Sequence, residues 1–191
     1  MKKKKIKLSN LFFILLLALL IIPKTRTFIQ VSLQKAIVEI NPFGPSSIAH
    51  EDQIQLQPFD YRVASLDGIH VQSPVGKGKV TFISYWATWC PPCIAEIPSL
   101  ELLYADYGNK VNFLFITNED PERVSAFLDR KELNIPAVRP LMETPETLHE
   151  RSIPTNYIID KKGRIVVKEQ GAANWNTQEI RELLDSLLAA S

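Results

Sequence analysis

Two segments of the chain are almost continuously hydrophobic over the length of a strand. They are VTFISYW (residues 80–86) and VNFLFIT (residues 111–117), and neither shows the regular alternation of a half-exposed strand. Such runs are typical of parallel strands that are buried on both faces. We therefore predict two central strands at the middle of an α/β sheet.

Hairpin signals flank this pair of strands on both sides. Within residues 61–73, Asp67-Gly68 separates two short alternating segments, and a KKG turn separates residues 156–160 from residues 164–169. Short polar turns with Gly between such segments favour antiparallel hairpins. The sheet is therefore predicted to be mixed.

Helical patterns fill the remaining intervals. Apolar residues recur every three or four positions over residues 91–107, with Pro98 inside, and over residues 177–189. The sequence DPE opens a helix over residues 120–132, and TPE opens a shorter one over residues 144–151, because each combines a cap residue, a proline and an acid. This order of elements predicts a mixed sheet, parallel in its middle, with helices on both faces.

The first residues combine lysines with a hydrophobic run. Residues 11–22 are strictly apolar, which is short of the roughly 20 residues of a full span, and no small-residue cleavage site follows them. We predict an uncleaved signal anchor over residues 1–26; a cleaved signal peptide and a buried core helix are the alternatives. Five lysines precede the run, so the positive-inside rule places the N-terminus in the cytoplasm and residues 27–191 outside the cytoplasmic membrane, in the periplasm or its equivalent.

Residues 27–54 are predicted to form an amphipathic stalk and a linker, before a folded domain that occupies residues 55–191. A row of apolar residues at helical spacing indicates a helix over residues 28–40, and NPFGPSS (residues 41–47) has the turn-forming residues of a linker. The helix is expected either to lie on the outer leaflet or to form a plain stalk. The apolar row consists of Ile29, Leu33, Ala36, Ile37 and Ile40.

The charge of the folded part argues against a nucleic-acid partner. The composition, 46% hydrophobic and 23% charged, is that of one globular domain. Residues 1–30 hold seven of the 22 Lys and Arg residues and none of the 21 Asp and Glu. Residues 31–191 therefore carry 15 basic and 21 acidic side chains, a net charge of −6, whereas nucleic-acid binding requires a basic face on the folded domain.

Both cysteines of the chain, Cys90 and Cys93, lie in the sequence WATWCPPC, where a predicted strand runs into a predicted helix. Two cysteines one helical turn apart are within disulfide reach, and unpaired N–H groups at the helix N-terminus favour a thiolate on the first. Cys90 is expected to be the exposed nucleophile and Cys93 the resolving thiol. A structural disulfide, a zinc site and a copper carrier are alternatives; the disulfide loop would be short, and a lone cysteine pair lacks further metal ligands.

The sequence around the cysteines resembles the active site of thioredoxin-fold proteins, and more closely that of the membrane-anchored TlpA/ResA-type thiol–disulfide oxidoreductases. The resemblance covers roughly residues 55–191 and implies a thioredoxin fold, a mixed central sheet flanked by helices, with an N-terminal hairpin extension. Besides WATWCPPC, the matching positions are Pro98 in the active-site helix, Ser152-Ile153-Pro154-Thr155 in the cis-proline loop, Asp160-Lys161-Lys162-Gly163 in the last turn and Gly171-Ala172 before the final helix.

The resemblance assigns roles to residues around two of these motifs. Cys90 and Cys93 would be the catalytic pair and would form the redox-active disulfide. Pro154 would be cis, with an ordinary trans proline as the alternative. The Ile153 backbone would face an extended substrate strand, and Thr155 would help to present it.

Two further site residues and one departure follow from the same resemblance. Trp89 would shield the disulfide. Glu96, one turn beyond Cys93, matches an acidic residue that tunes the cysteines in ResA-like proteins; a glutamate that only complements the helix dipole is the alternative. Cytoplasmic thioredoxins carry a buried aspartate where this chain has Ser84, so Glu96 is the candidate to take the proton of Cys93.

The expected activity is the reduction of disulfides in extracytoplasmic client proteins, such as cytochrome c precursors, with electrons from a membrane dithiol donor. Pro91 and Pro92 supply no backbone N–H to the Cys90 thiolate, which should raise the thiol pKa and make the couple more reducing. A net oxidant or isomerase, a tethered client-binding module and, more weakly, a peroxidase are the alternatives. The expected chemistry implies no metal and no bound cofactor.

Overall fold

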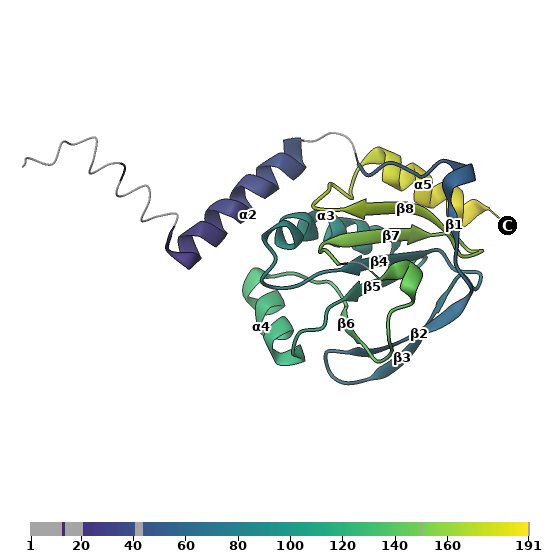
Figure 1. Cartoon of the computed structure of the whole chain (residues 1–191), viewed down its shortest axis with the longest axis horizontal. Helices are drawn as coiled ribbons and strands as arrows, with labels where there is room; N and C mark the ends of the chain where they lie inside the picture. Colours follow the sequence, from purple (N-terminus) through teal and green to yellow (C-terminus); the bar gives the residue numbers. More distant parts are fainter. Residues whose placement is uncertain (1–12, 14–20, 41–43, 150, 191) are drawn as a thin grey trace, which may run out of the picture.

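A computed structural model describes residues 13, 21–40, 44–149 and 151–190 of the chain (Figure 1). The helices are α2 (Pro23–Ile40), α3 (Pro91–Tyr107), α4 (Pro121–Lys131) and α5 (Gln178–Ala189), with the 3-10 turns η1 (His50–Asp52) and η2 (Glu146–Leu148). The strands are β1 (Ile54–Gln55), β2 (Phe59–Ser65), β3 (His70–Val75), β4 (Thr81–Tyr85), β5 (Asn112–Ile116), β6 (Ala137–Pro140), β7 (Thr155–Ile159) and β8 (Arg164–Gln170).

The strands form one mixed sheet in the order β1-β8-β7-β4-β5-β6-β2-β3. β4, β5 and β6 are parallel, and antiparallel strands extend the sheet on both sides of them. The predicted hairpins are confirmed as β2–β3, which turns at Asp67-Gly68, and β7–β8. The mixed sheet with a parallel centre is therefore confirmed.

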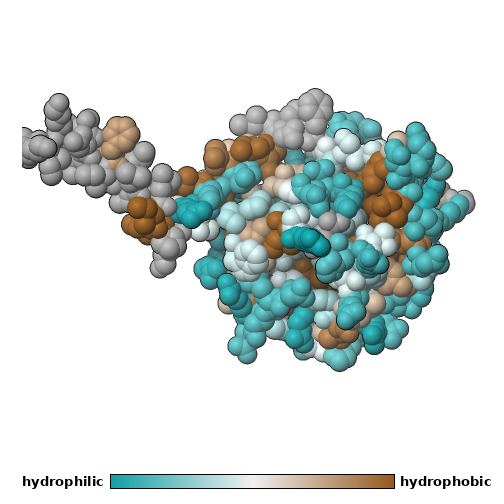
Figure 2. Space-filling view, viewed as in Figure 1, coloured by the Kyte–Doolittle hydropathy of each residue, from teal (hydrophilic) through white to brown (hydrophobic). Residues whose placement is uncertain are grey.

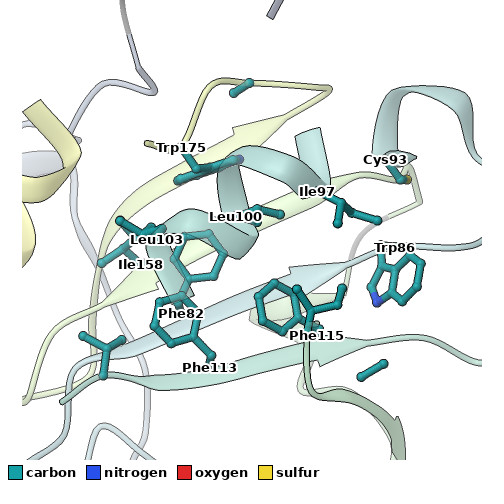
Figure 3. Packing of buried hydrophobic residues seen from close by; sticks show 14 of the residues in the cluster. Phe82, Trp86, Cys93, Ile97, Leu100, Leu103, Phe113, Phe115, Ile158 and Trp175 are labelled. Atoms are coloured by element: carbon teal, nitrogen blue, oxygen red, sulfur yellow. The ribbon is translucent and has the colours of Figure 1, made fainter. Parts of the chain in front are cut away.

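Helices α3, α4 and α5 lie on one face of this sheet. In the sheet, β5 lies next to β4, and β6 lies next to β5 on the side away from β4. Because both connections are right-handed crossovers in the same direction, α3 and α4 lie on the same face of the sheet. Phe82 and Phe115 point to that side and share a buried cluster with residues of α3, α4 and α5 (Figure 3). Ile83 points to the opposite side, where short segments such as η2, with Leu148, cover it. Helices were expected on both faces of the sheet. On the second face, short segments such as the 3-10 turn η2 take the place of an α-helix.

Two local predictions need correction. The pattern does not predict β6, because its four residues end in Pro140 and show no alternation; the strand exists because β5 and β2 pair with it on either side. The helix predicted over residues 144–151 is the single 3-10 turn η2. Thr144, the expected cap, instead shares a hydrogen bond of 2.9 Å with the Tyr61 hydroxyl, so a longer helix would lack its cap.

α2 contains the helix predicted over residues 28–40 and begins earlier, at Pro23. It packs against α3, where Val38 is buried. The predicted anchor over residues 1–26 lies mostly outside the described residues, as does almost all of its hydrophobic run over residues 11–22. Among the helices that are described, none is long and apolar enough to cross a membrane. The anchor therefore stays a prediction.

Candidate active site

A disulfide joins Cys90 and Cys93 at the N-terminus of α3, with their Cα atoms 5.3 Å apart. The chain enters this turn from the end of β4, so the disulfide lies at the carboxyl end of a central strand, as predicted. Cys90 is the N-cap residue of α3, and its Sγ accepts the backbone N–H of Cys93 at 3.3 Å. The two prolines between them have no N–H to offer, so Cys93 provides the first helical N–H that reaches the sulfur.

Cys90 is less exposed than the sequence predicts. Only 3% of its surface is accessible in this disulfide form, and Cys93 is fully buried. The Ile153 carbonyl oxygen lies 3.7 Å from Cys90 Sγ, so the loop before β7 covers the sulfur that a client would have to reach. Trp89, the neighbour of Cys90 in the chain, is 60% exposed. Its role as a shield for the disulfide stays a prediction.

The loop that faces the disulfide contains a cis peptide bond between Ile153 and Pro154, as predicted. The Pro154 carbonyl accepts the Gly171 N–H at 2.9 Å, and the Thr155 hydroxyl donates to the Ser152 carbonyl at 2.8 Å. Thr155 is fully buried, and its hydroxyl supports the loop from within. The contribution of Ile153, Pro154 and Thr155 to substrate binding stays a prediction.

Glu96 lies one helical turn beyond Cys93 and is fully buried. Its carboxyl group accepts hydrogen bonds from the Asn156 side chain at 3.0 Å, the Trp175 indole N–H at 3.2 Å and the Ala173 N–H at 3.3 Å. Burial raises the pKa of Glu96 to about 8, because desolvation of the charged form outweighs these three donors. A glutamate that only complements the helix dipole would be solvated, so the structure favours a group that titrates beside Cys93.

Ser84 occupies the position at which thioredoxins carry a buried aspartate. It is buried on the α3 side of β4, and its hydroxyl has no hydrogen-bond partner among the described residues. A serine hydroxyl does not accept a proton near neutral pH. β4 therefore supplies no ionisable group at this position, and the role of Glu96, one helical turn beyond Cys93 on α3, stays a prediction.

Sequence reasoning missed a second carboxylate at the cysteine turn. Glu119 follows β5, and its oxygens accept the Thr88 N–H at 2.6 Å and the Thr88 hydroxyl at 2.7 Å. Arg123, in the first turn of α4, pairs with the same carboxylate at 3.2 Å. Because parallel strands end at the same edge of a sheet, a polar residue just after β5 is the signal that could have placed Glu119 beside this turn.

A hollow of about 390 Å³ opens beside Trp89 in the turn that leads to Cys90. Trp89 and Ile153 form part of its wall, so it lies between the two segments that are expected to meet a client. Glu119, Thr144 and His149 add polar groups to the lining. The arrangement offers space for side chains of an extended peptide beside the turn that leads to Cys90.

The sequence profile described as Redoxin matches residues 55–187, which include every predicted site residue. The chain belongs to the redoxin family. The thiol-disulfide oxidoreductase ResA of Halalkalibacterium halodurans is 30% identical to this redoxin over 148 residues, which cover 75% of this chain and 82% of the relative. The thioredoxin-like protein YneN of Bacillus subtilis is 31% identical over 130 residues, 66% of this chain and 75% of the relative.

Solved structures agree with this assignment. A protein from Bacteroides vulgatus, assigned as a thiol-disulfide oxidoreductase, has a TM-score of 0.54 and 29% identity over 70% of this redoxin and 96% of that chain. The predicted resemblance to ResA-type proteins is thus confirmed. This redoxin is a protein-disulfide oxidoreductase with a thioredoxin-like fold and the cysteine pair Cys90 and Cys93.

Proposed function

We propose that this redoxin reduces disulfides of client proteins on the outer side of the cytoplasmic membrane, to which residues 11–22 tether it, and that a membrane dithiol donor returns it to the dithiol form. The observation that carries the proposal is the burial of Glu96 near the cysteine pair. This residue places a buried carboxyl group, with a pKa of about 8, one helical turn from Cys93. A group with this pKa exchanges protons with a thiol near neutral pH.

Reduction of a client begins from the dithiol form. The Cys90 thiolate attacks one sulfur of the client disulfide, a mixed disulfide forms, and the other client sulfur leaves as a thiolate that takes a proton from water. Cys93 then gives its proton to the Glu96 carboxylate and attacks Cys90 Sγ, and the second client thiolate leaves. Two electrons have passed to the client, and the enzyme retains the Cys90–Cys93 disulfide and a protonated Glu96.

The raised pKa of Glu96 suits the return step as well. In the disulfide form, a carboxyl group with a pKa of about 8 is mostly protonated at neutral pH. It can therefore return the proton to Cys93 when a donor dithiol reopens the Cys90–Cys93 bond. A carboxyl group with the ordinary pKa of 4.5 would have lost that proton to solvent.

The direction of electron flow is proposed from the N-terminus of α3. Strong oxidants of this kind stabilise their thiolate with nearby donors and positive charge. Here Pro91 and Pro92 withdraw two backbone N–H groups, and the Cys93 N–H is the helical donor at 3.3 Å from Cys90 Sγ. A thiolate with so little support gives up its electrons readily, which favours a reductant.

The location and the clients are proposed from the sequence and its relatives. The lysines before the hydrophobic run support an N-terminus in the cytoplasm and a domain outside. The similarity to proteins named thiol-disulfide oxidoreductase ResA supports clients that contain disulfides, and we propose cytochrome c precursors as an example. The hollow beside Trp89 and Ile153 would take the side chains next to the client cysteine.

An equilibrium redox titration of the full chain in detergent, against defined thiol–disulfide buffers, tests the direction. A midpoint near or below about −250 mV supports a reductase, whereas one above about −150 mV places the protein with the oxidants and contradicts the proposal. An intermediate value, near the roughly −180 mV of disulfide isomerases, favours an isomerase. Cys90→Ser should abolish client reduction; a variant that keeps its full function would be a client-binding module.

A further inference from the structure

Helix α2 has two hydrophobic faces, one covered by the domain and one exposed. Val38 is buried against α3, and Val31 packs against the main hydrophobic cluster. Ile29, Leu33 and Ile37 recur at every fourth residue and are 41%, 60% and 53% exposed. Figure 2 shows hydrophobic residues along the outer side of α2. Ile29, Leu33 and Ile37 of the predicted apolar row are therefore turned away from the domain.

The exposed row is not needed to hold α2 against the domain, because Val31 and Val38 already provide an apolar contact face. Burial of large aliphatic side chains is favourable, and several of them in one row form a surface that tends to be covered. Phe28 lies directly before the row in the chain and is also strongly exposed. A second contact partner for α2 is therefore expected.

The surrounding sequence indicates the chemistry of that partner. α2 begins at Pro23, immediately after the hydrophobic run of residues 11–22. Over α2 (Pro23–Ile40) the sequence carries three basic residues and one acid, Glu39, which is a net charge of +2. Basic residues together with an exposed apolar row are typical of a helix that lies in the interface of an anionic membrane. The basic residues are Lys24 and Arg26, which come shortly after the hydrophobic run in the sequence, and Lys35, which lines a hollow between α2 and α3.

We propose that α2 lies along the outer surface of an anionic lipid bilayer, with Ile29, Leu33 and Ile37 inserted between the lipids. The proposal rests on the tethering by residues 11–22 proposed above. A second copy of the chain fits the row less well. One row of three side chains is much smaller than the roughly 800 Å² that each partner of a stable protein interface buries.

The contact between α2 and α3 gives this docking a consequence for the active site. A hollow of about 220 Å³ between the two helices is lined by Val38 of α2 and by Ala95 and Pro98 of α3. On α3 this lining runs from Ala95, two residues beyond Cys93, to Leu102, so α2 packs along the middle of the helix whose first turn carries the disulfide. A bilayer under α2 would hold the disulfide at a fixed distance from the lipid, where a membrane dithiol donor acts.

The first test locates the row in the full chain. Both native cysteines are replaced by serine, and one cysteine is introduced for an environment-sensitive fluorophore, through Leu33→Cys or, as the control on exposed α4 surface, Asp129→Cys. The protein is reconstituted into vesicles of phosphatidylethanolamine and phosphatidylglycerol that carry a quencher on their acyl chains. We expect strong quenching at position 33 and none at position 129. Unquenched emission at position 33 overturns the proposal, whether water or a second copy covers the row.

A second test separates the docking of α2 from the proposed activity. The variant Ile29→Gln/Leu33→Gln/Ile37→Gln is compared with Gln30→Ser/Ser32→Gln, which changes exposed polar positions of the same helix. Turnover with a lipid-linked dithiol should fall several-fold in the first variant only, while turnover with dissolved dithiothreitol stays unchanged in both. Equal turnover of both variants with the lipid-linked dithiol would overturn the docking role. An unmodified chain that dithiothreitol cannot drive would instead contradict the proposed function.

Discussion

Two glutamates flank the cysteine turn, and their surroundings differ in one decisive respect. Glu96 approaches from α3, is fully buried, and accepts hydrogen bonds from three neutral donors, with no cation among its described contacts. Glu119 approaches from the loop after β5 and pairs with Arg123 while it accepts two bonds from Thr88. One residue type thus occurs here once without and once with a cationic partner.

The difference teaches how this fold assigns two tasks to one kind of side chain. Neutral donors offset only part of the cost of burying a charge, so the pKa of Glu96 rises to about 8 and the group can carry a proton. The carboxylate of Glu119 has a guanidinium partner and is held by two bonds to the turn that leads to Cys90. It is suited to fix the position of that turn.

The largest effect is expected from Glu96→Gln, which keeps the shape of the side chain and removes its ability to take a proton. The attack of Cys93 on the mixed disulfide should slow by about 100-fold, the lower end of general acid–base contributions. Rapid-quench measurements of client reduction should then show accumulated mixed disulfide. Glu119→Gln is the control and should not accumulate it. Unchanged kinetics in the Glu96 variant would remove Glu96 from the mechanism.

The same substitution should change how the stability of the disulfide form depends on pH. The pKa of Glu96 is about 8 in the folded chain, against an ordinary value of 4.5. Between these values the folded chain holds a proton that the unfolded chain releases, so stability falls as pH rises, by up to about 1.4 kcal/mol per pH unit. Glu96→Gln should abolish this component of the slope.

Denaturant unfolding of both proteins, from about pH 5 to about pH 8, measures this difference. Part of the difference in the free energy of unfolding should not depend on pH, because the amide cannot accept all three hydrogen bonds of the carboxyl group. Only the change of the difference with pH reports on the titration of Glu96. Parallel curves would mean that the pKa of Glu96 is not raised in the folded chain.

Glu119→Gln should destabilise the turn before Cys90, because hydrogen bonds to a charged group contribute about 1.5–3 kcal/mol. Amide exchange at Thr88 should accelerate, and global unfolding should shift by a similar or smaller amount. Thr88→Val is the matched variant, since it removes the hydroxyl bond and keeps the backbone N–H bond to Glu119. A loss in Thr88→Val as large as that in Glu119→Gln would assign the effect to the hydroxyl alone.

The strands and helices around the site could be predicted because local pattern decides them. β4 and β5 are buried on both faces and read as hydrophobic runs, and the predicted helix over residues 91–107 coincides with α3. β6 could not be predicted, because its neighbours in the sheet create it. Likewise the expected exposure of Cys90 was wrong because a loop 63 residues away in sequence covers it.

The surroundings of the two glutamates could not be predicted from local pattern either, because their contacts come from residues that are distant in the sequence. Glu96 could be named only through a family resemblance, and its partners Asn156 and Trp175 are 60 and 79 residues away in sequence. Glu119 lies 31 residues from Thr88, and no spacing rule connects them. The proximity of Glu119 to the cysteine turn could have been predicted from the topology, since parallel strands bring their carboxyl ends to one edge of the sheet.

A smaller effect is expected from Glu169→Gln. Burial is the main cause of the raised pKa of Glu96, and the negative charge of Glu169 adds to it. Glu169 lies opposite Asn156 in the β7–β8 ladder, and Asn156 is a hydrogen-bond donor to Glu96. Removal of the Glu169 charge should lower the pKa of Glu96. The change should be less than about one pH unit, because the two carboxyl groups are not in direct contact. Carboxyl titration by isotope-edited NMR measures it, with Glu122→Gln on α4 as control; equal values in both variants contradict the coupling.

The smallest effect is expected from Arg123→Gln. This variant measures how much the ion pair with Arg123 contributes to the stability of the turn that Glu119 holds. The Arg123 side chain is 61% exposed, so solvent screens the pair and its loss should cost less than about 1 kcal/mol, falling further at high salt. The bonds from Thr88 should survive and keep the turn in place. In a double-mutant cycle, Arg123→Gln should have no further effect once Glu119→Gln is present. If Arg123→Gln alone matched the loss in Glu119→Gln, the ion pair and not the Thr88 bonds would hold the turn.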